Sequence, residues 1–249
     1  MKIAVITGAT SGMGEEFARQ ISWRLHGIDE IWVFGRRKER LLQLQDKIHQ
    51  KIRIFDGDLA EETTFERLVK ALEQERPVIR ILVNSAGFGK LGKTSDISIE
   101  DSLGMIEINC KALTRMTMLC MPYFRPGTRV ILLASSAAFL PQPGFNIYAA
   151  TKSYVLFFGR ALRQELREKK VCVTMVCPGP VKTEFFDIAE EHAKSPFYKK
   201  LFYAEKQKVV EQALQDALDK KEVSVYGMPM KVFRVLCKMV PHSLILRKC

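Results

Sequence analysis

Short runs dominated by apolar residues alternate with helical stretches along the first part of the chain. The runs contain mostly Ile, Val, Leu and Phe, and each is too short to form a helix. They lie at residues 3–6, 30–35, 51–55 and 80–84. Helices are expected between them, at residues 15–25, 38–50 and 61–75. Because such runs are typical of strands buried on both faces, the pattern predicts parallel βαβ units doubly wound around one sheet.

The second part of the chain continues the alternation. Further helices are expected at residues 102–121, 148–170, 206–221 and 230–240, and further strands at 128–134 and 223–226. A chain of 249 residues, 47% of them hydrophobic, is long enough to bury a large core. No Pro-, Gly- or Ser-rich linker marks a boundary, so residues 1–249 are expected to form a single α/β domain.

The chain's beginning and its cysteines indicate a cellular compartment. The first strand follows Met1 almost directly, which leaves no room for a signal peptide, and no apolar run is long enough to span a membrane. The six cysteines are scattered without Cys-x-x-Cys spacing, so we expect neither a metal site nor a disulfide framework. These features predict a cytoplasmic protein.

Three glycines follow the first strand in the spacing Gly8-x-x-x-Gly12-x-Gly14, where a helix begins. Glycine permits a sharp turn and the close approach of a phosphate, while a helix start offers free N–H groups and a positive dipole end. The spacing differs from the common Gly-x-Gly-x-x-Gly fingerprint, so a merely tight connection remains an alternative. We expect the turn to bind a dinucleotide through Thr7, Gly8, Thr10, Ser11, Gly12, Met13 and Gly14.

Two arginines, Arg36 and Arg37, follow the second strand, where an acidic residue would favour NAD. A guanidinium group can bind the 2′-phosphate of NADP with forked, charge-assisted hydrogen bonds. The pair therefore favours NADP (NADPH), although it could simply decorate the start of the next helix. Asp58 and Asn84 follow the third and fourth strands and belong to the same edge of the sheet, where ligands collect.

Tyr148 and Lys152 lie four residues apart at the start of the expected helix 148–170, so both side chains can point into one cleft. A nearby ammonium group stabilises phenolate and lowers the pKa of a tyrosine, which suits a proton donor to a carbonyl oxygen. Ser135 stands at the end of the preceding strand. These residue types favour acid–base chemistry at a carbonyl group.

Together these motifs resemble the single-domain short-chain dehydrogenase/reductase family, from Lys2 to about Thr183. Ser85 departs from the pattern, because the family more often has a second asparagine there, but this weakens a structural hydrogen bond at most. The segments that carry the resemblance are Thr7-Gly-x-x-x-Gly-x-Gly14, Asn84-Ser-Ala-Gly87, Asn109, Ser135, Tyr148-x-x-x-Lys152 and Pro178-Gly179.

The resemblance implies a Rossmann-type sheet and four catalytic residues. Tyr148 would be the general acid or base, and Ser135 would bind the substrate oxygen. Ser135 is chosen over Ser136 because it stands the thirteen positions before the tyrosine that the family most often shows. Lys152 would bind the nicotinamide ribose and lower the tyrosine pKa. Asn109 would hold a water of the proton relay, or alternatively satisfy a break in helix 102–121.

The resemblance also implies cofactor contacts along the strand ends. Asp58 and Leu59 would meet the adenine, and Thr183 would bind the nicotinamide carboxamide. The remaining contacts would come from Asn84, Ala86, Gly87, Pro178, Gly179 and Val181, together with Tyr148 and Lys152.

The family places a substrate lid after Thr183, here residues 184–208. The segment is rich in aromatic residues, which suggests a hydrophobic substrate, although the rings could equally pack as core or as a subunit contact. The aromatic residues in question are Phe185, Phe186, Phe197, Tyr198, Phe202 and Tyr203. Phe88, Phe139 and Phe145 are expected near the mouth of the same pocket.

The last segment, residues 228–249, forms an amphipathic helix with a basic face and a second apolar patch. Residues 194–249 contain twelve Lys or Arg and five Asp or Glu, so they carry +7 of the chain's net charge of +11. This tail could lie on an anionic membrane, or it could cover the pocket or a subunit interface. Nucleic acid is not an expected partner, since no known reading motif is present.

The function predicted from the sequence is NADP-dependent interconversion of a hydrophobic ketone and its alcohol, for example a 3-oxoacyl or hydroxysteroid-like substrate. The alternative is a sensor or scaffold protein that keeps the fold and binds NADP without turnover. The complete set of Ser135, Tyr148, Lys152 and Asn109 argues against that alternative. Family resemblance suggests a homodimer or homotetramer.

Overall fold

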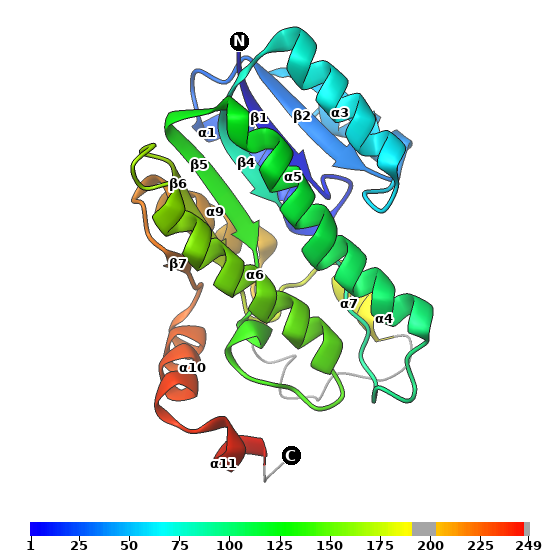
Figure 1. The fold of residues 1–249 in the computed structure, drawn as a ribbon, viewed down its shortest axis with the longest axis vertical. Helices are drawn as coiled ribbons and strands as arrows, with labels where there is room; N and C mark the ends of the chain where they lie inside the picture. Colours follow the sequence, from blue (N-terminus) through cyan, green and yellow to red (C-terminus); the bar gives the residue numbers. More distant parts are fainter. Residues whose placement is uncertain (191–202, 247–249) are drawn as a thin grey trace.

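The computed structural model describes residues 1–190 and 203–246, which contain a seven-stranded parallel sheet (Figure 1). The strand order is β3-β2-β1-β4-β5-β6-β7, so the order reverses between β1 and β4. A reversal of this kind opens a crevice beyond the carboxyl ends of the two strands. The strands are β1 (Lys2–Thr7), β2 (Glu30–Gly35), β3 (Lys51–Asp56), β4 (Val78–Asn84), β5 (Phe124–Leu133), β6 (Cys172–Val176) and β7 (Val223–Ser224).

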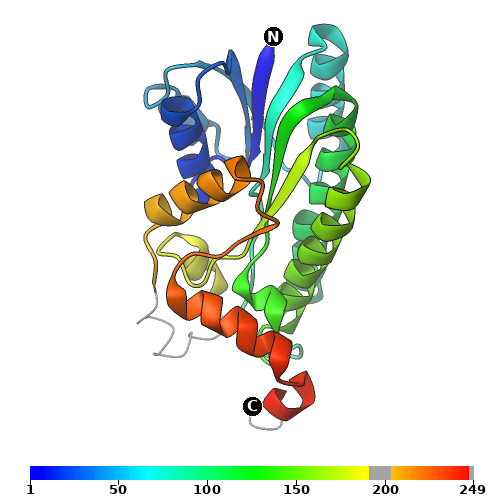
Figure 2. The same cartoon turned by 90° about the vertical axis from the view of Figure 1, so that its left-hand side faces the viewer.

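Helices cover both faces of this sheet (Figure 2). One face carries α1 (Gly12–Arg24), α2 (Lys38–Gln45) and α9 (Lys206–Leu218). The opposite face carries α3 (Glu62–Glu75), α5 (Leu113–Cys120) and α6 (Asn146–Glu165).

Strand β1 shows why the sheet is covered twice. Its residues Ile3 and Val5 pack into the core beneath α3, α5 and α6, whereas Ala4 and Ile6 pack into the core beneath α1, α2 and α9. Successive side chains of a strand point to opposite faces, so an unbroken apolar run must be buried on both. The predicted doubly wound α/β fold is confirmed.

The helix expected at 102–121 begins earlier and changes its pitch midway. It consists of α4 (Ile99–Ile106), a π-helical turn at Glu107–Ala112, and α5. Smaller differences occur elsewhere: β6 lies in a stretch for which no strand was predicted, α2 and α6 end five residues early, and β7 is only two residues long. The π turn matters for the site, because Asn109 lies within it.

Three further helices lie near the carboxyl ends of the strands, namely α7 (Phe185–Ala189), α10 (Met228–Met239) and α11 (His242–Leu246). The amphipathic helix predicted near the C-terminus is confirmed as α10. Of the expected lid, residues 191–202 with Phe197, Tyr198 and Phe202 lie outside the described residues. Among the helices that the structure describes, none is both long and apolar enough to cross a membrane.

Candidate active site

The glycine turn between β1 and α1 forms a cradle at the strand ends. Gly8 has a φ of +69°, and a Cβ atom at this position would lie 2.8 Å from the backbone of Ala86. At Gly14 a Cβ atom would lie 2.2 Å from the oxygen of Gly8. A side chain at either position would therefore collide with the backbone. Because both residues are glycines, the turn can be tight and still leave space for a ligand.

The start of α1 keeps its N–H groups available. Ser11 is the N-cap residue, but its side chain does not cap the helix. Its hydroxyl instead accepts a hydrogen bond from Arg37, at 2.9 Å. Uncapped N–H groups at a helix N-terminus bind phosphate, so the turn fits the pyrophosphate of a dinucleotide.

A cavity of 1040 Å³ lies at the carboxyl ends of the strands and begins at this turn. Its volume is at the upper end of the range for small-molecule sites, and it has room for an extended ligand. The predicted site residues that line it are Gly8, Thr10, Ser11, Gly12, Met13, Gly14, Arg36, Arg37, Asp58, Leu59, Ala86, Gly87, Ser135, Tyr148, Lys152, Pro178, Gly179, Val181 and Thr183.

Thr7 and Asn84 are predicted cofactor ligands, but neither lines the cavity. The Thr7 hydroxyl accepts hydrogen bonds from the N–H groups of Ser85 and Ala86, both at 3.0 Å. The Asn84 amide donates to the Thr117 hydroxyl at 2.9 Å. Both side chains are buried. Thr7 thus joins the end of β1 to the segment after β4, and Asn84 joins the end of β4 to α5. Direct contacts of these two residues with the cofactor stay a prediction.

Asn109 is also buried behind the cavity wall. Its amide donates to the carbonyl of Phe88 at 2.9 Å and to the hydroxyl of Thr151 at 3.0 Å, and its oxygen accepts from the Phe88 N–H at 3.1 Å. The side chain thus connects the π turn, the segment after β4 and α6. This geometry agrees with the helix-break alternative, and it leaves the side chain no free donor for a water.

Tyr148 and Lys152 project from the first turns of α6 into the cavity, where both are buried. The Lys152 ammonium donates to the backbone oxygen of Leu133 at 2.8 Å and lies 5.6 Å from the centre of the Tyr148 ring. Ser135 caps a short 3-10 helix at the end of β5 and faces the phenol closely enough for a hydrogen bond. The two hydroxyl groups can therefore bind one substrate oxygen.

Burial dominates the ionisation of this cluster. It raises the pKa of Tyr148, while the Ser135 hydrogen bond opposes the shift. Burial also lowers the pKa of Lys152, to about 8. In this arrangement the loss of hydration outweighs the other effects on the phenol, so a lowering of the Tyr148 pKa by Lys152 stays a prediction. Tyr148 is accordingly a protonated acid at neutral pH.

Matches to known proteins agree with this geometry. The family model for short chain dehydrogenases matches residues 2–194. The chain belongs to the short-chain dehydrogenase family. A sulfoacetaldehyde reductase of Chromohalobacter salexigens is 33% identical over 192 residues, 74% of each chain. An NADP-dependent 3-hydroxy acid dehydrogenase of Escherichia coli is 35% identical over 190 residues, 75% of each chain.

Solved structures show the same fold. A serine dehydrogenase in closed form with NADP⁺ is 29% identical, with a TM-score of 0.76 over 90% of this chain and 94% of that one. A short-chain dehydrogenase of Sphingobium yanoikuyae with NADPH has a TM-score of 0.79 over 98% of both chains, at 24% identity.

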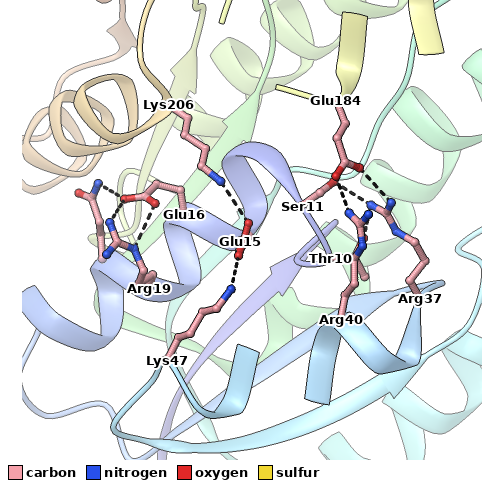
Figure 3. A network of polar contacts seen from close by, with 11 residues as sticks. Thr10, Ser11, Glu15, Glu16, Arg19, Arg37, Arg40, Lys47, Glu184 and Lys206 are labelled. Carbon is pink, nitrogen blue, oxygen red and sulfur yellow. Dashed lines mark hydrogen bonds and ion pairs between the residues drawn. The ribbon is translucent and has the colours of Figure 1, made fainter. Parts of the chain in front are cut away.

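An arginine cluster lies beside the glycine turn of this short-chain dehydrogenase, just after β2 (Figure 3). Arg37 donates to Glu184 at 2.9 Å, to Ser11 at 2.9 Å and to Thr10 at 3.3 Å. Arg40 donates to the other oxygen of Glu184 at 2.6 Å. Arg36 is more exposed and lies 3.6 Å from Asp58.

Aromatic rings surround Tyr148. Phe145 stacks on Tyr148 with the ring centres 4.3 Å apart, and Phe185 of α7 lies 5.3 Å from it. Phe88 packs against the same cluster. By contrast, Phe139 packs beside the main core and lies 6.5 Å from Phe233. The wall next to the phenol of Tyr148 is therefore apolar.

Helix α10 has two apolar stripes. Met230 and Phe233 line the cavity, and Met230 packs so closely on Gly179 that a Cβ there would lie 2.6 Å from its sulfur. A second stripe faces outward, with each side chain at least half exposed: Val232, Val235, Leu236 and Met239. The tail thus covers part of the pocket and also presents an apolar surface to solvent.

Arg40, Glu184 and Met230 are among the contributors to the site that were missed from the sequence. Arg40 lies one turn beyond Arg37 on the helix expected at 38–50, so helical spacing could have indicated it. Glu184 was assigned only to the lid, and Met230 only to the amphipathic tail. Their partners are distant in sequence, and local patterns contain no signal for such contacts.

Proposed function

We propose that this short-chain dehydrogenase is an NADP-dependent oxidoreductase that interconverts a hydrophobic ketone and its secondary alcohol. The observation that carries the proposal is one cavity with two chemically different ends. Tyr148, Ser135 and Lys152 converge at one end, and the glycine turn and Arg37 lie at the other. A dinucleotide whose phosphates lie on the turn can reach both ends, because the cavity connects them.

NADP is the proposed cofactor because the end of β2 is cationic. Arg36 and Arg37 line the cavity where a carboxylate would otherwise bind the ribose of NAD. The Escherichia coli relative is named as NADP-dependent, and the serine dehydrogenase structure contains NADP⁺. When bound, the nicotinamide group supplies or accepts the hydride.

The residues of the chain supply the proton and the positioning. Ser135 and Tyr148 hold the substrate oxygen by hydrogen bonds, which polarise the carbonyl group. The phenol, which is protonated at neutral pH and whose pKa burial raises further, then delivers its proton to that oxygen. Lys152 lies on the same side and is proposed to bind the ribose hydroxyls. In the reverse direction the tyrosine takes the proton from the alcohol.

A hydrophobic substrate fits the aromatic wall. An acid or a sulfonate would place its charge against Phe145 and Phe185, whereas an apolar ketone would bury its own surface there. Met230 and Phe233 extend the apolar wall from α10. The relatives named for hydroxy acids and sulfoacetaldehyde provide the competing substrate classes for a test.

The face formed by α4, α5 and α6 is proposed to bind a second copy of the chain. Large apolar side chains lie exposed along these helices, and clustered apolar surface of this kind is typical of contacts between proteins. A two-fold pair would bury the same stripe of both copies. The side chains are Ile99, Leu103, Ile106, Met118, Tyr154 and Phe157, which are between 42% and 80% exposed. Charge introduced by Phe157→Glu should convert the dimer to a monomer in analytical ultracentrifugation.

We also propose that the outward stripe of α10 contacts an anionic membrane surface. Val232, Leu236 and Met239 share this stripe, and Lys231 and Lys238 flank it and are exposed. Apolar residues beside cations are typical of helices that lie in a membrane interface.

The function is tested by measuring oxidation of NADPH and of NADH by the purified protein. The panel contains hydrophobic ketones, 3-oxoacyl thioesters, 3-oxo acids and sulfoacetaldehyde. The proposal expects NADPH and hydrophobic carbonyls to be preferred by at least tenfold in kcat/KM. Preference for the small anions would overturn the substrate class, and tight NADPH binding without turnover would favour the sensor alternative.

A further inference from the structure

Glu184 occupies the position of an anion between two arginines. Its two oxygens accept hydrogen bonds from different guanidinium groups, Arg37 at 2.9 Å and Arg40 at 2.6 Å. These bonds, that of Arg40 first, hold the pKa of the Glu184 carboxyl below its usual range. The carboxylate is therefore charged at neutral pH and neutralises part of the cluster.

The same cluster is where the proposed function places the 2′-phosphate of NADP. Arg37 is held against the glycine turn by Thr10 and Ser11, so its guanidinium stays at the end of β2. Phosphate and carboxylate both use the forked donors of arginine. A phosphate bound to Arg37 would lie beside the negative charge of Glu184, which already accepts a hydrogen bond from this guanidinium, so the two anions compete.

Glu184 is also joined to the wall of the substrate site. It is the residue before α7, whose first residue, Phe185, lies 5.3 Å from Tyr148. At the other end of α7, the carbonyl of Ala189 accepts from the N–H of Leu91 at 2.8 Å. The short helix is thus fixed at both ends, one end by the arginine cluster.

Resting on the proposed NADP-dependent function, we propose that Glu184 is a specificity-determining residue that competes with the 2′-phosphate for Arg37 and Arg40. Its carboxylate weakens the binding of 2′-phosphorylated nucleotides and leaves nucleotides without this phosphate unaffected. Binding of the phosphate releases Glu184, and with it the start of α7 beside the catalytic tyrosine.

The size of the effect follows from the exposure of the groups. Arg37, Arg40 and Glu184 are each between 40% and 43% exposed, so solvent screens the ion pairs. Each exposed ion pair of this kind changes an equilibrium constant by about twofold to fivefold. Removing the competing charge should therefore tighten binding of a 2′-phosphate by roughly threefold to tenfold.

The test uses two probes that differ only in the 2′-phosphate and undergo no reaction, adenosine 2′,5′-bisphosphate and 5′-AMP. Their dissociation constants are measured by calorimetry on the full chain and on Glu184→Gln, which keeps the size of the side chain. The variant should bind the bisphosphate about threefold to tenfold more tightly and 5′-AMP within about twofold of the parent. An unchanged or weaker affinity for the bisphosphate would overturn the proposal.

A matched control is Glu211→Gln, which breaks another exposed ion pair, with Arg24 at 2.9 Å. It should leave both affinities unchanged, because neither residue lines the cavity. If Glu211→Gln tightened bisphosphate binding as much as Glu184→Gln, the effect would be one of net charge and the proposal would fail.

The readout separates this proposal from the proposed function. Equal affinity of the parent for the two probes, with a gain for the bisphosphate only in Glu184→Gln, would reject NADP preference while supporting the competition. If the parent prefers the bisphosphate and the variant shows no gain, the NADP preference is supported and the competition by Glu184 is rejected. Absence of carbonyl reduction would affect only the proposed reaction, since neither probe reacts.

Discussion

Lys152 donates a hydrogen bond from its Nζ atom to the backbone oxygen of Leu133, 2.8 Å away, and this bond fixes a buried ammonium group at the end of β5. A buried charge is costly in free energy, and burial accordingly lowers the pKa of Lys152 to about 8. The position of the lysine therefore costs stability.

Lys152→Met should increase stability while abolishing turnover. Below pH 8 both the folded and the unfolded chain hold the lysine proton, so the full cost of burial is present. Between about pH 8 and 10.5, the usual pKa of a lysine, the folded chain has lost the proton and the unfolded chain still binds it, so stability rises with pH. After allowing for the lost hydrogen bond, we expect a gain of about 2 kcal/mol at pH 7.

Urea unfolding of both proteins at pH 7 and pH 9.5 checks this prediction. The parent should approach the stability of Lys152→Met as the pH rises, while the difference stays constant for an exposed control, Lys70→Met on α3. A parent and a Lys152→Met variant with parallel pH dependence would show that burial of this charge is not costly.

Tyr148→Phe should lower kcat by at least about 100-fold, because it removes the proton donor, and should leave NADPH affinity within about twofold. Since burial raises the pKa of Tyr148, the phenol stays protonated through the ordinary assay range. The rate of ketone reduction should therefore show no decrease between pH 6 and pH 9 that is due to deprotonation of the tyrosine. Alcohol oxidation needs the phenolate, so its rate should rise about tenfold per pH unit in that range. Oxidation rates that are flat with pH would contradict the role of Tyr148.

Sequence patterns predicted the parts of this molecule that local physics determines. Strand β1 is apolar at every position from Ile3 to Ile6, and only a doubly covered sheet buries both of its faces. The spacing of Tyr148 and Lys152 places both on one helix face whatever lies opposite them. For the same reason, nearly all the residues of the predicted site line the cavity.

The parts that sequence patterns missed depend on distant partners. The π turn holds Asn109, whose amide bonds Phe88 and Thr151, 21 and 42 residues away. Glu184 binds Arg40 across 144 residues. Burial of Tyr148, rather than the nearby lysine, decides the direction of its pKa shift. None of these relationships has a periodicity that a local pattern could reveal.

Arg37→Gln should weaken NADPH binding by about tenfold or more, because a charge-assisted bond to a phosphate is lost. NADH, which lacks the 2′-phosphate, should bind within about twofold of the parent. Fluorescence titration with each nucleotide measures both affinities. The control, Arg24→Gln, removes an exposed arginine of α1 that does not line the cavity. Equal losses for NADPH and NADH would mean that Arg37 supports the glycine turn rather than the 2′-phosphate.

Leu236→Asp should abolish binding of the protein to anionic vesicles. Leu236 is 51% exposed in the outward stripe of α10, and it contributes apolar surface that an acidic side chain would keep in water. The parent should sediment with vesicles that contain phosphatidylglycerol and remain in solution with vesicles of phosphatidylcholine alone. Leu42→Asp on α2, where the leucine is 49% exposed, should sediment as the parent does. If the parent ignores anionic vesicles, or if Leu236→Asp instead changes the oligomeric state in ultracentrifugation, the stripe belongs to a protein contact and the membrane proposal is wrong.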